Sequence, residues 1–193
     1  MGLSIQSCTD GISVDQIHYI SSLALIQLSR CRADQKHSHL SDSEKRDYRA
    51  LVGQLQWVST HTRPDIAFDT CDLSGSSKNA LIADMIRLNK LVERVQKESL
   101  KLFFPRLSSF ETCILECYTD AAFANLPNGG SQGGFIIFLL DDSGQRCPLF
   151  WQSRRLKRVV KSTLAAETLA LLEGAEASVY LAEKAQDWHI SHR

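Results

Sequence analysis

The chain has 193 residues, of which 44% are hydrophobic and 23% are charged. This length suits one large domain or two small ones, and the composition excludes a disordered or fibrous chain. The 22 basic and 22 acidic residues give a formal net charge of zero. Overall charge therefore gives no support to nucleic-acid binding, and such a function must be argued from local clusters.

Membrane insertion and secretion are not expected. The sequence has no run of about 18 apolar residues, which a membrane helix would need. Its start lacks the basic region and apolar core of a signal peptide, which predicts an intracellular protein, cytoplasmic or nuclear. The six cysteines include no Cys-x-x-Cys pair, and we interpret them as structural thiols rather than zinc ligands.

The first part of the chain is predicted to be helical. Helical spacing predicts a helix over 42–61, and its apolar face consists of Tyr48, Leu51, Val52, Leu55 and Val58. Pro64 ends that helix, because proline disfavours helical geometry in the preceding residue. We expect a further helix over 78–99, a weaker one over 16–28, and a loop over the polar stretch 30–43.

After residue 108 the pattern changes. Three β-like runs, at 113–119, 134–141 and 145–153, are separated by turn residues at 128–130 and 142–144. Short connections favour an antiparallel meander. A helix over 162–185 follows, capped by Ser162 or Thr163. The predicted fold class is α+β or α/β, with a helical region 1–108 and a β-β-β-α region 109–193.

Two acidic residues could carry chemistry. Asp120 ends the first β-like run and Glu167 lies in the first turns of the last helix. Each alone is more readily a solvated surface residue. Together, if the helix packs over the central strand, they could converge as hard oxygen ligands for Mg²⁺. Two such ions about 4 Å apart would suit phosphodiester cleavage.

A basic cluster lies between the last β-like run and the last helix. No acidic residue occurs from Ser143 to Ala166, so this segment favours a polyanionic partner. The alternative is a solvated face or loop. The predicted phosphate contacts are Arg154, Arg155, Lys157, Arg158 and Lys161.

Several sequence motifs resemble those of a known family. YRALVG at 48–53 and THTRPDIAF at 60–68 are similar to the segment after the polymerase palm in Ty1/copia-type retrotransposon Pol polyproteins. YTDAAF at 118–123, GSQGGF at 130–135, WQS at 151–153 and STLAAE at 162–167 resemble, in order, the RNase H part of the same polyproteins.

The resemblance implies a thumb- and connection-like helical segment followed by an RNase H-like domain. By motif position, Asp120 corresponds to the catalytic Asp of the first strand and Glu167 to the catalytic Glu of the first helix. The implied activity is hydrolysis of RNA in RNA–DNA hybrids with two Mg²⁺ or Mn²⁺ ions.

This sequence departs from the family pattern in its metal ligands. The family has a third Asp on a following parallel strand and a fourth acidic residue or His, and neither has a counterpart here. No Tyr/Phe-x-Asp-Asp polymerase motif occurs either. We therefore expect no polymerisation, and hydrolysis that is impaired or lost.

Two hypotheses remain open. One is a truncated reverse transcriptase/RNase H fragment, and the other is a non-catalytic nucleic-acid-binding fragment or an inert remnant. A three-stranded sheet with one helix would leave an edge unpaired, so we expect either marginal stability or self-association through that sheet edge.

Overall fold

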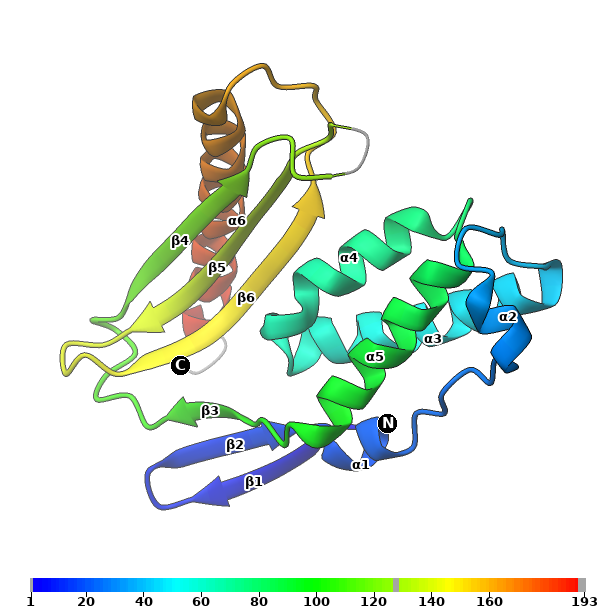
Figure 1. Ribbon diagram of the computed structural model, residues 1–193. Coiled ribbons are helices and arrows are strands. Elements are labelled where there is room, and N and C mark those ends of the chain that lie inside the picture. Colours follow the sequence, from blue (N-terminus) through cyan, green and yellow to red (C-terminus); the bar gives the residue numbers. More distant parts are fainter. Residues whose placement is uncertain (1, 127–128, 191–193) are drawn as a thin grey trace. The chain divides into compact units, whose positions relative to one another are not determined.

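The computed structural model describes residues 2–126 and 129–190, and no side chain after residue 185 (Figure 1). The predicted turn residue Asn128 thus lies outside the described residues. The chain contains helices and antiparallel sheets, which confirms the α+β class. It divides into two compact units: residues 1–7 with 13–102, and residues 8–12 with 103–193. Within the described residues, no helix has the length and apolar character needed to cross a membrane.

The first unit is mainly helical. Its helices are α1 (Ile17–Ser21), α2 (Arg30–Asp34), α3 (Asp42–His61), the 3-10 helix η1 (Pro64–Ile66), α4 (Ala67–Ser76) and α5 (Ile82–Lys97). Helix α3 has the predicted bounds, because Ser41 and Glu44 form a capping box that satisfies two backbone N–H groups at its start. Helix α5 lies within the predicted range 78–99.

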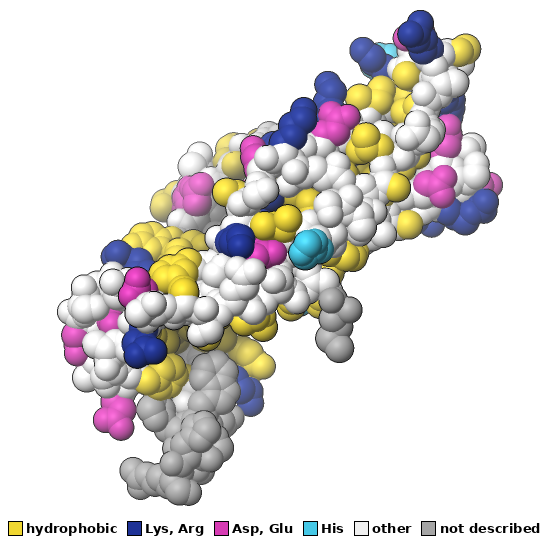
Figure 2. All heavy atoms as spheres, turned by 90° about the horizontal axis from the view of Figure 1, so that it is seen from below, with side chains coloured by type: hydrophobic (Ala, Val, Ile, Leu, Met, Phe, Trp, Pro, Cys, Tyr) yellow, Lys and Arg dark blue, Asp and Glu magenta, His cyan; other side chains and the backbone are white. Residues whose placement is uncertain are grey.

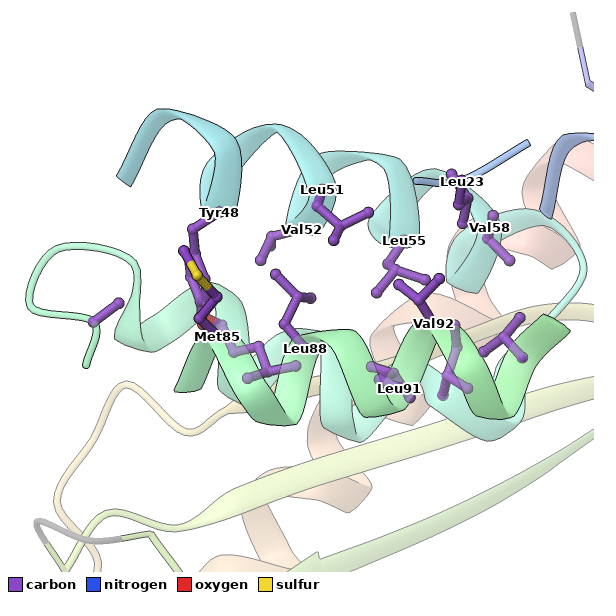
Figure 3. Packing of buried hydrophobic residues seen from close by; sticks show 14 of the residues in the cluster. Leu23, Tyr48, Leu51, Val52, Leu55, Val58, Met85, Leu88, Leu91 and Val92 are labelled. Carbon is purple, nitrogen blue, oxygen red and sulfur yellow. The ribbon is translucent and has the colours of Figure 1, made fainter. Parts of the chain in front are cut away.

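Apolar side chains of α3 and α5 point toward one another and form the core of this unit (Figure 3). Tyr48, Leu55 and Val58 of α3 are fully buried, as are Leu88 and Val92 of α5. This confirms the apolar face that helical spacing predicted for α3. The hydroxyl of Tyr48 donates a hydrogen bond to the carbonyl of Leu73, so the phenol is buried without an unsatisfied polar group.

The predictions for the segment before α3 were wrong. Helix α1 stops at Ser21 rather than Leu28, and α2 lies within the predicted loop 30–43. Side chains of α5 explain the early end: the Asn89 amide bonds to both backbone groups of Ile26, and the Gln96 amide donates to the carbonyls of Ile20 and Leu23. These tertiary bonds replace the helical ones that would otherwise satisfy the backbone.

A small sheet of order β1-β2-β3 was not predicted from the sequence. It consists of β1 (Ser4–Cys8), β2 (Gly11–Asp15) and β3 (Leu102–Pro105). A side chain at Gly11 would collide with the backbone carbonyl of Phe104, so glycine permits close strand approach there. Pairing of segments about 90 residues apart leaves no local pattern in the sequence.

The second unit contains the predicted antiparallel meander and helix. Its elements are β4 (Ile114–Ala122), β5 (Gln132–Leu140), β6 (Arg146–Arg155) and α6 (Thr163–Ile190), with strand order β4-β5-β6. The Ser162 hydroxyl accepts a hydrogen bond from the backbone N–H of Ala165, as expected of a helix cap. Figure 1 shows α6 lying along this sheet.

Asp141 organises the turn between β5 and β6. Its carboxylate accepts hydrogen bonds from the backbone N–H groups of Ser108, Ser143 and Gln145 and from the Ser143 hydroxyl. These bonds, that from Ser108 first, lower the pKa of the Asp141 carboxyl well below its usual range despite the opposing effect of burial. One side chain thus fixes the turn and the segment that leads into β4.

Small residues set the distance between α6 and the sheet. A Cβ atom added at Gly174 would lie 2.6 Å from Cγ2 of Thr119 and 2.9 Å from Sγ of Cys117. One turn earlier, the Cβ of Ala170 lies 3.4 Å from the position that a Cβ at Gly133 would take. The odd-numbered residues of β4 and β5 therefore face α6 at close range.

Arg63 is the most deeply buried charged side chain of the first unit, with 1% of its surface exposed. Its guanidinium donates two hydrogen bonds of 2.8 Å to the Asp65 carboxylate and others to the backbone carbonyls of Val95 and Glu98 at the end of α5. Burial raises the pKa of the Asp65 carboxyl, but Arg63 outweighs this and holds it below its ordinary value. The side chain thus satisfies carbonyls that a helix end leaves free.

We predict that Arg63→Ala lowers the free energy of unfolding by about 3 kcal/mol, because buried acceptors and a carboxylate lose their partner. Arg63→Lys should destabilise the protein by a smaller amount, because the ammonium group of lysine keeps the charge but cannot form the two parallel hydrogen bonds of the planar guanidinium. Urea unfolding followed by circular dichroism measures both. The control is Arg46→Ala, at an exposed position of α3, and equal stability of the Arg63 and Arg46 variants would contradict the assignment.

We predict that Gly174→Ala destabilises the second unit by about 1–2 kcal/mol through overpacking, although alanine is the better helix former. Adding Thr119→Ser, which removes Cγ2, should recover part of the loss. Gly53→Ala in α3 is the matched control, because nothing lies within 4 Å of a Cβ atom there, and it should stabilise. Urea unfolding tests the three variants, and stabilisation by Gly174→Ala would refute the close contact.

Candidate functional site

The predicted site residues gather at one end of the β4–β6 sheet. At this end β4 and β6 finish, while β5 and α6 begin. The strand register places Asp120 beside Gly134 and Gly134 beside Ser153. The next row towards this end consists of Ala122, Gln132 and Arg155.

Asp120 lies on the face of the sheet that points away from α6. Its neighbour Thr119 contacts the backbone of α6 at Gly174, and successive side chains of a strand point to opposite faces. The exposure pattern agrees, because Tyr118, Asp120 and Ala122 are exposed whereas Thr119 is half-buried. Gly134 beside it carries no side chain, so the carboxylate stands in open surroundings.

Glu167 lies on the other side of β4. It precedes Gly174 by seven residues, two helical turns or about 10 Å, and is on the same side of the helix. The neighbouring Ala166 and Ala170 are fully buried against the sheet, and Glu167 is half-buried. Since Gly174 contacts Thr119 and Cys117, this side of α6 faces β4.

The structure thus brings Asp120 and Glu167 to the same end of β4 but not to the same face. On its outer edge β4 has no partner strand among the described residues. Among the residues that the structure describes, no three His, Cys, Asp or Glu side chains form a group that could hold a metal ion.

The first two residues of the predicted basic cluster point in opposite directions. Arg154 faces α6 and forms a bidentate ion pair with Glu173, with N–O distances of 2.7 and 2.6 Å. The hydrogen bond that the Arg154 guanidinium donates to the Glu173 carboxylate raises the pKa of Arg154. Arg155 lies on the open face, where its guanidinium covers Gly130. Arg154 therefore joins β6 to α6 and is not free for phosphate.

The other three basic residues, Lys157, Arg158 and Lys161, are exposed in the loop between β6 and α6. The loop is anchored at its start, because Leu156 is buried and its N–H donates to the carbonyl of Ser131. Elsewhere the charges are mixed: Figure 2 shows acidic and basic side chains interspersed over one face of the molecule. This loop is therefore a local positive region on a chain of zero net charge.

Gln132 and Ser153 were not predicted as site residues. Gln132 is 4% exposed, and its amide donates a 3.0 Å hydrogen bond to the Ser153 hydroxyl. Its carbonyl oxygen is buried without a hydrogen-bond partner among the described residues. Both residues belong to sequence motifs that were singled out above, GSQGGF and WQS, but the signal there was a resemblance and not a chemical role.

A cavity of about 240 Å³ lies in the first unit, between α4 and α5. Its lining includes Arg87 and Arg94 of α5, which are paired with Asp72 and Asp69 of α4 at 2.7 and 2.8 Å. These ion pairs join the two helices, so we interpret the two arginines as structural. Lys90, also in the lining, is exposed.

Comparison with known proteins finds a similarity to a Pol polyprotein. No protein-family model matches the chain. Over 122 residues the chain is 30% identical to the retrovirus-related Pol polyprotein from transposon RE1 of Arabidopsis thaliana. The alignment covers 63% of this chain and 8% of the relative, so the chain spans a small part of that protein's length. The similarity supports a fragment of a retrotransposon Pol polyprotein.

Proposed function

We propose that the chain is the part of a copia-type Pol polyprotein that leads from the end of reverse transcriptase into the RNase H domain. In this proposal it binds RNA–DNA hybrid, whereas hydrolysis of the RNA strand is impaired or lost. The gathering of Asp120, Glu167 and the basic loop at one end of the β4–β6 sheet is the observation that carries the proposal. The similarity to a Pol polyprotein supports it.

Hybrid binding would rest on the exposed cations of the basic loop. Lys157, Arg158 and Lys161 are exposed, and no carboxylate occurs between residues 143 and 166 to neutralise them. Phosphate groups bound by such side chains release counterions, which makes the affinity depend on salt. Arg155, on the open face with Asp120, would add a contact there, while Arg154 would act indirectly by holding β6 against α6 through Glu173.

The metal site of the family does not fit this arrangement. Mg²⁺ needs several oxygen ligands at about 2.0–2.1 Å. Asp120 and Glu167 could supply two, but the pleat of β4 directs one carboxylate to each side of the strand. These two side chains do not by themselves make a two-ion site, so we derive no hydrolytic step from them. Polymerisation is likewise not proposed, because the sequence contains no Tyr/Phe-x-Asp-Asp motif.

The second candidate is a nucleic-acid-binding module without catalysis. The basic loop favours it, because the loop remains exposed and anchored whether or not the carboxylates meet. The two candidates share the binding step and differ in hydrolysis. A chain that binds no nucleic acid at physiological salt would fit neither, and would instead be an inert remnant.

Titration of a fluorescent RNA–DNA hybrid at several salt concentrations tests the binding step. We expect affinity to fall steeply with salt, and Lys157→Ala/Arg158→Ala to reduce the log–log slope by about 2, as two lost phosphate contacts require. Binding should weaken at least about tenfold.

The matched control is Arg46→Ala/Arg49→Ala, which removes two exposed arginines from α3. This pair should change the slope less. Equal effects of the two double variants would show that the basic loop has no special role. Absence of binding by the unmodified chain at about 0.15 M salt would refute the proposal itself.

A further inference from the structure

The segment 157–161, between β6 and α6, forms no hydrogen bond or ion pair within the described part of the chain. Both of its ends are anchored. Leu156 is buried and donates its backbone N–H to the carbonyl of Ser131, while the Ser162 hydroxyl accepts from the N–H of Ala165 at the start of α6. The backbone between these anchors is left to water, so it can change conformation without breaking a hydrogen bond.

This segment also carries the side chains that a protease for basic residues recognises. Lys157 and Arg158 are adjacent and exposed, and Val159, which follows them, has 95% of its surface exposed. An endopeptidase of the trypsin type takes a basic side chain into its specificity pocket. It must also draw the residues around the bond into its cleft, which exposed and weakly held loops permit. The bond between Arg158 and Val159 meets both requirements.

Exposure of a basic side chain is not sufficient, because other basic residues are held by their backbone. Arg154 and Arg155 belong to β6 and are paired with β5. In other connections, the N–H of Arg106 donates to the carbonyl of Asp10, and the carbonyl of Lys36 accepts from the backbone of α5. A protease would have to break these hydrogen bonds before cleavage, which lowers the population of the cleavable state.

We propose that the peptide bond between Arg158 and Val159 is a site of limited proteolysis by an endopeptidase specific for basic residues. Hydrolysis breaks the bond between the carbonyl carbon of Arg158 and the nitrogen of Val159. The carbon gains the hydroxyl of a water molecule and the nitrogen gains its remaining proton, which gives a new carboxyl group and a new amino group. The proposal does not depend on hybrid binding.

The cleaved chain stays assembled, because the contacts between its two pieces lie outside the loop. Arg154 of the first piece and Glu173 of the second form the bidentate ion pair with N–O distances of 2.7 and 2.6 Å. Gly174 packs closely against Thr119, and Ala170 is buried against the sheet. Cleavage therefore changes the loop and leaves α6 on the sheet.

Limited digestion of the full chain with trypsin, followed by mass spectrometry, tests the site. The first products should be 1–158 and 159–193, with this bond cut at least about tenfold faster than bonds after basic residues in helices and strands. Lys157→Gln/Arg158→Gln/Lys161→Gln should slow the loss of full-length chain at least about tenfold. Circular dichroism should not change, because the three side chains have no partner among the described residues.

The matched control is Arg106→Gln, which removes an exposed basic residue whose backbone is hydrogen-bonded. This variant should be digested at the rate of the unmodified chain and at the same bond. A first cut outside 157–161, or an unchanged rate in the triple variant, overturns the proposed site.

Size-exclusion chromatography of the digested protein tests whether the pieces stay together. They should elute together without denaturant and separate in urea. Glu173→Gln should lower the urea concentration at which they separate, whereas Glu183→Gln, at an exposed position of the same helix, should not. Separation of the pieces without urea would overturn the retention of α6 on the sheet.

Discussion

The close contact between α6 and β4 at Gly174 is the constraint on which the second unit depends. A helix this near the sheet tolerates only small residues at its contact points, and Ala166, Ala170 and Gly174 occupy them. The same contact determines which face of β4 packs against the helix. It also brings Glu173 to Arg154, so that the ion pair ties β6 to α6 as well.

This contact decides the geometry of the candidate site. Because Thr119 faces α6, the pleat sends Asp120 to the open face, whereas Glu167 stays on the helix side of β4. The carboxylates therefore share an end of the sheet without sharing a face. The basic loop is independent of this division, since it is held by Leu156 and Ser131. Binding of a polyanion and hydrolysis of a phosphodiester thus rest on different parts of the unit.

Local patterns predicted much of the fold. Helical spacing located α3, and alternation with turn residues located β4, β5, β6 and their antiparallel order. The early end of α1 could not be predicted, because it depends on Asn89 and Gln96, more than 60 residues away. Pairing of β3 with the N-terminal hairpin was missed for the same reason.

The sequence predicted which residues lie at the candidate site better than it predicted how their side chains are arranged. Motifs identified Asp120, Glu167 and the basic residues, but not that Arg154 is committed to Glu173, a partner 19 residues along the chain. Likewise, the sequence around Arg63 indicates only that a helix ends there. It does not predict that the Arg63 guanidinium donates hydrogen bonds to backbone carbonyls at the C-terminal end of α5. The face of Asp120 was within reach of sequence reasoning, since strand alternation alone separates it from Thr119.

Cleavage of a labelled RNA–DNA hybrid in Mg²⁺ or Mn²⁺, compared among the unmodified chain, Asp120→Asn and Glu167→Gln, tests the central claim most directly. With the carboxylates on opposite faces of β4, we predict that hybrid is bound but that the three proteins do not differ in cleavage. Metal-dependent cleavage by the unmodified chain that is abolished by both substitutions would contradict this, because it would require the two carboxylates to act at one site.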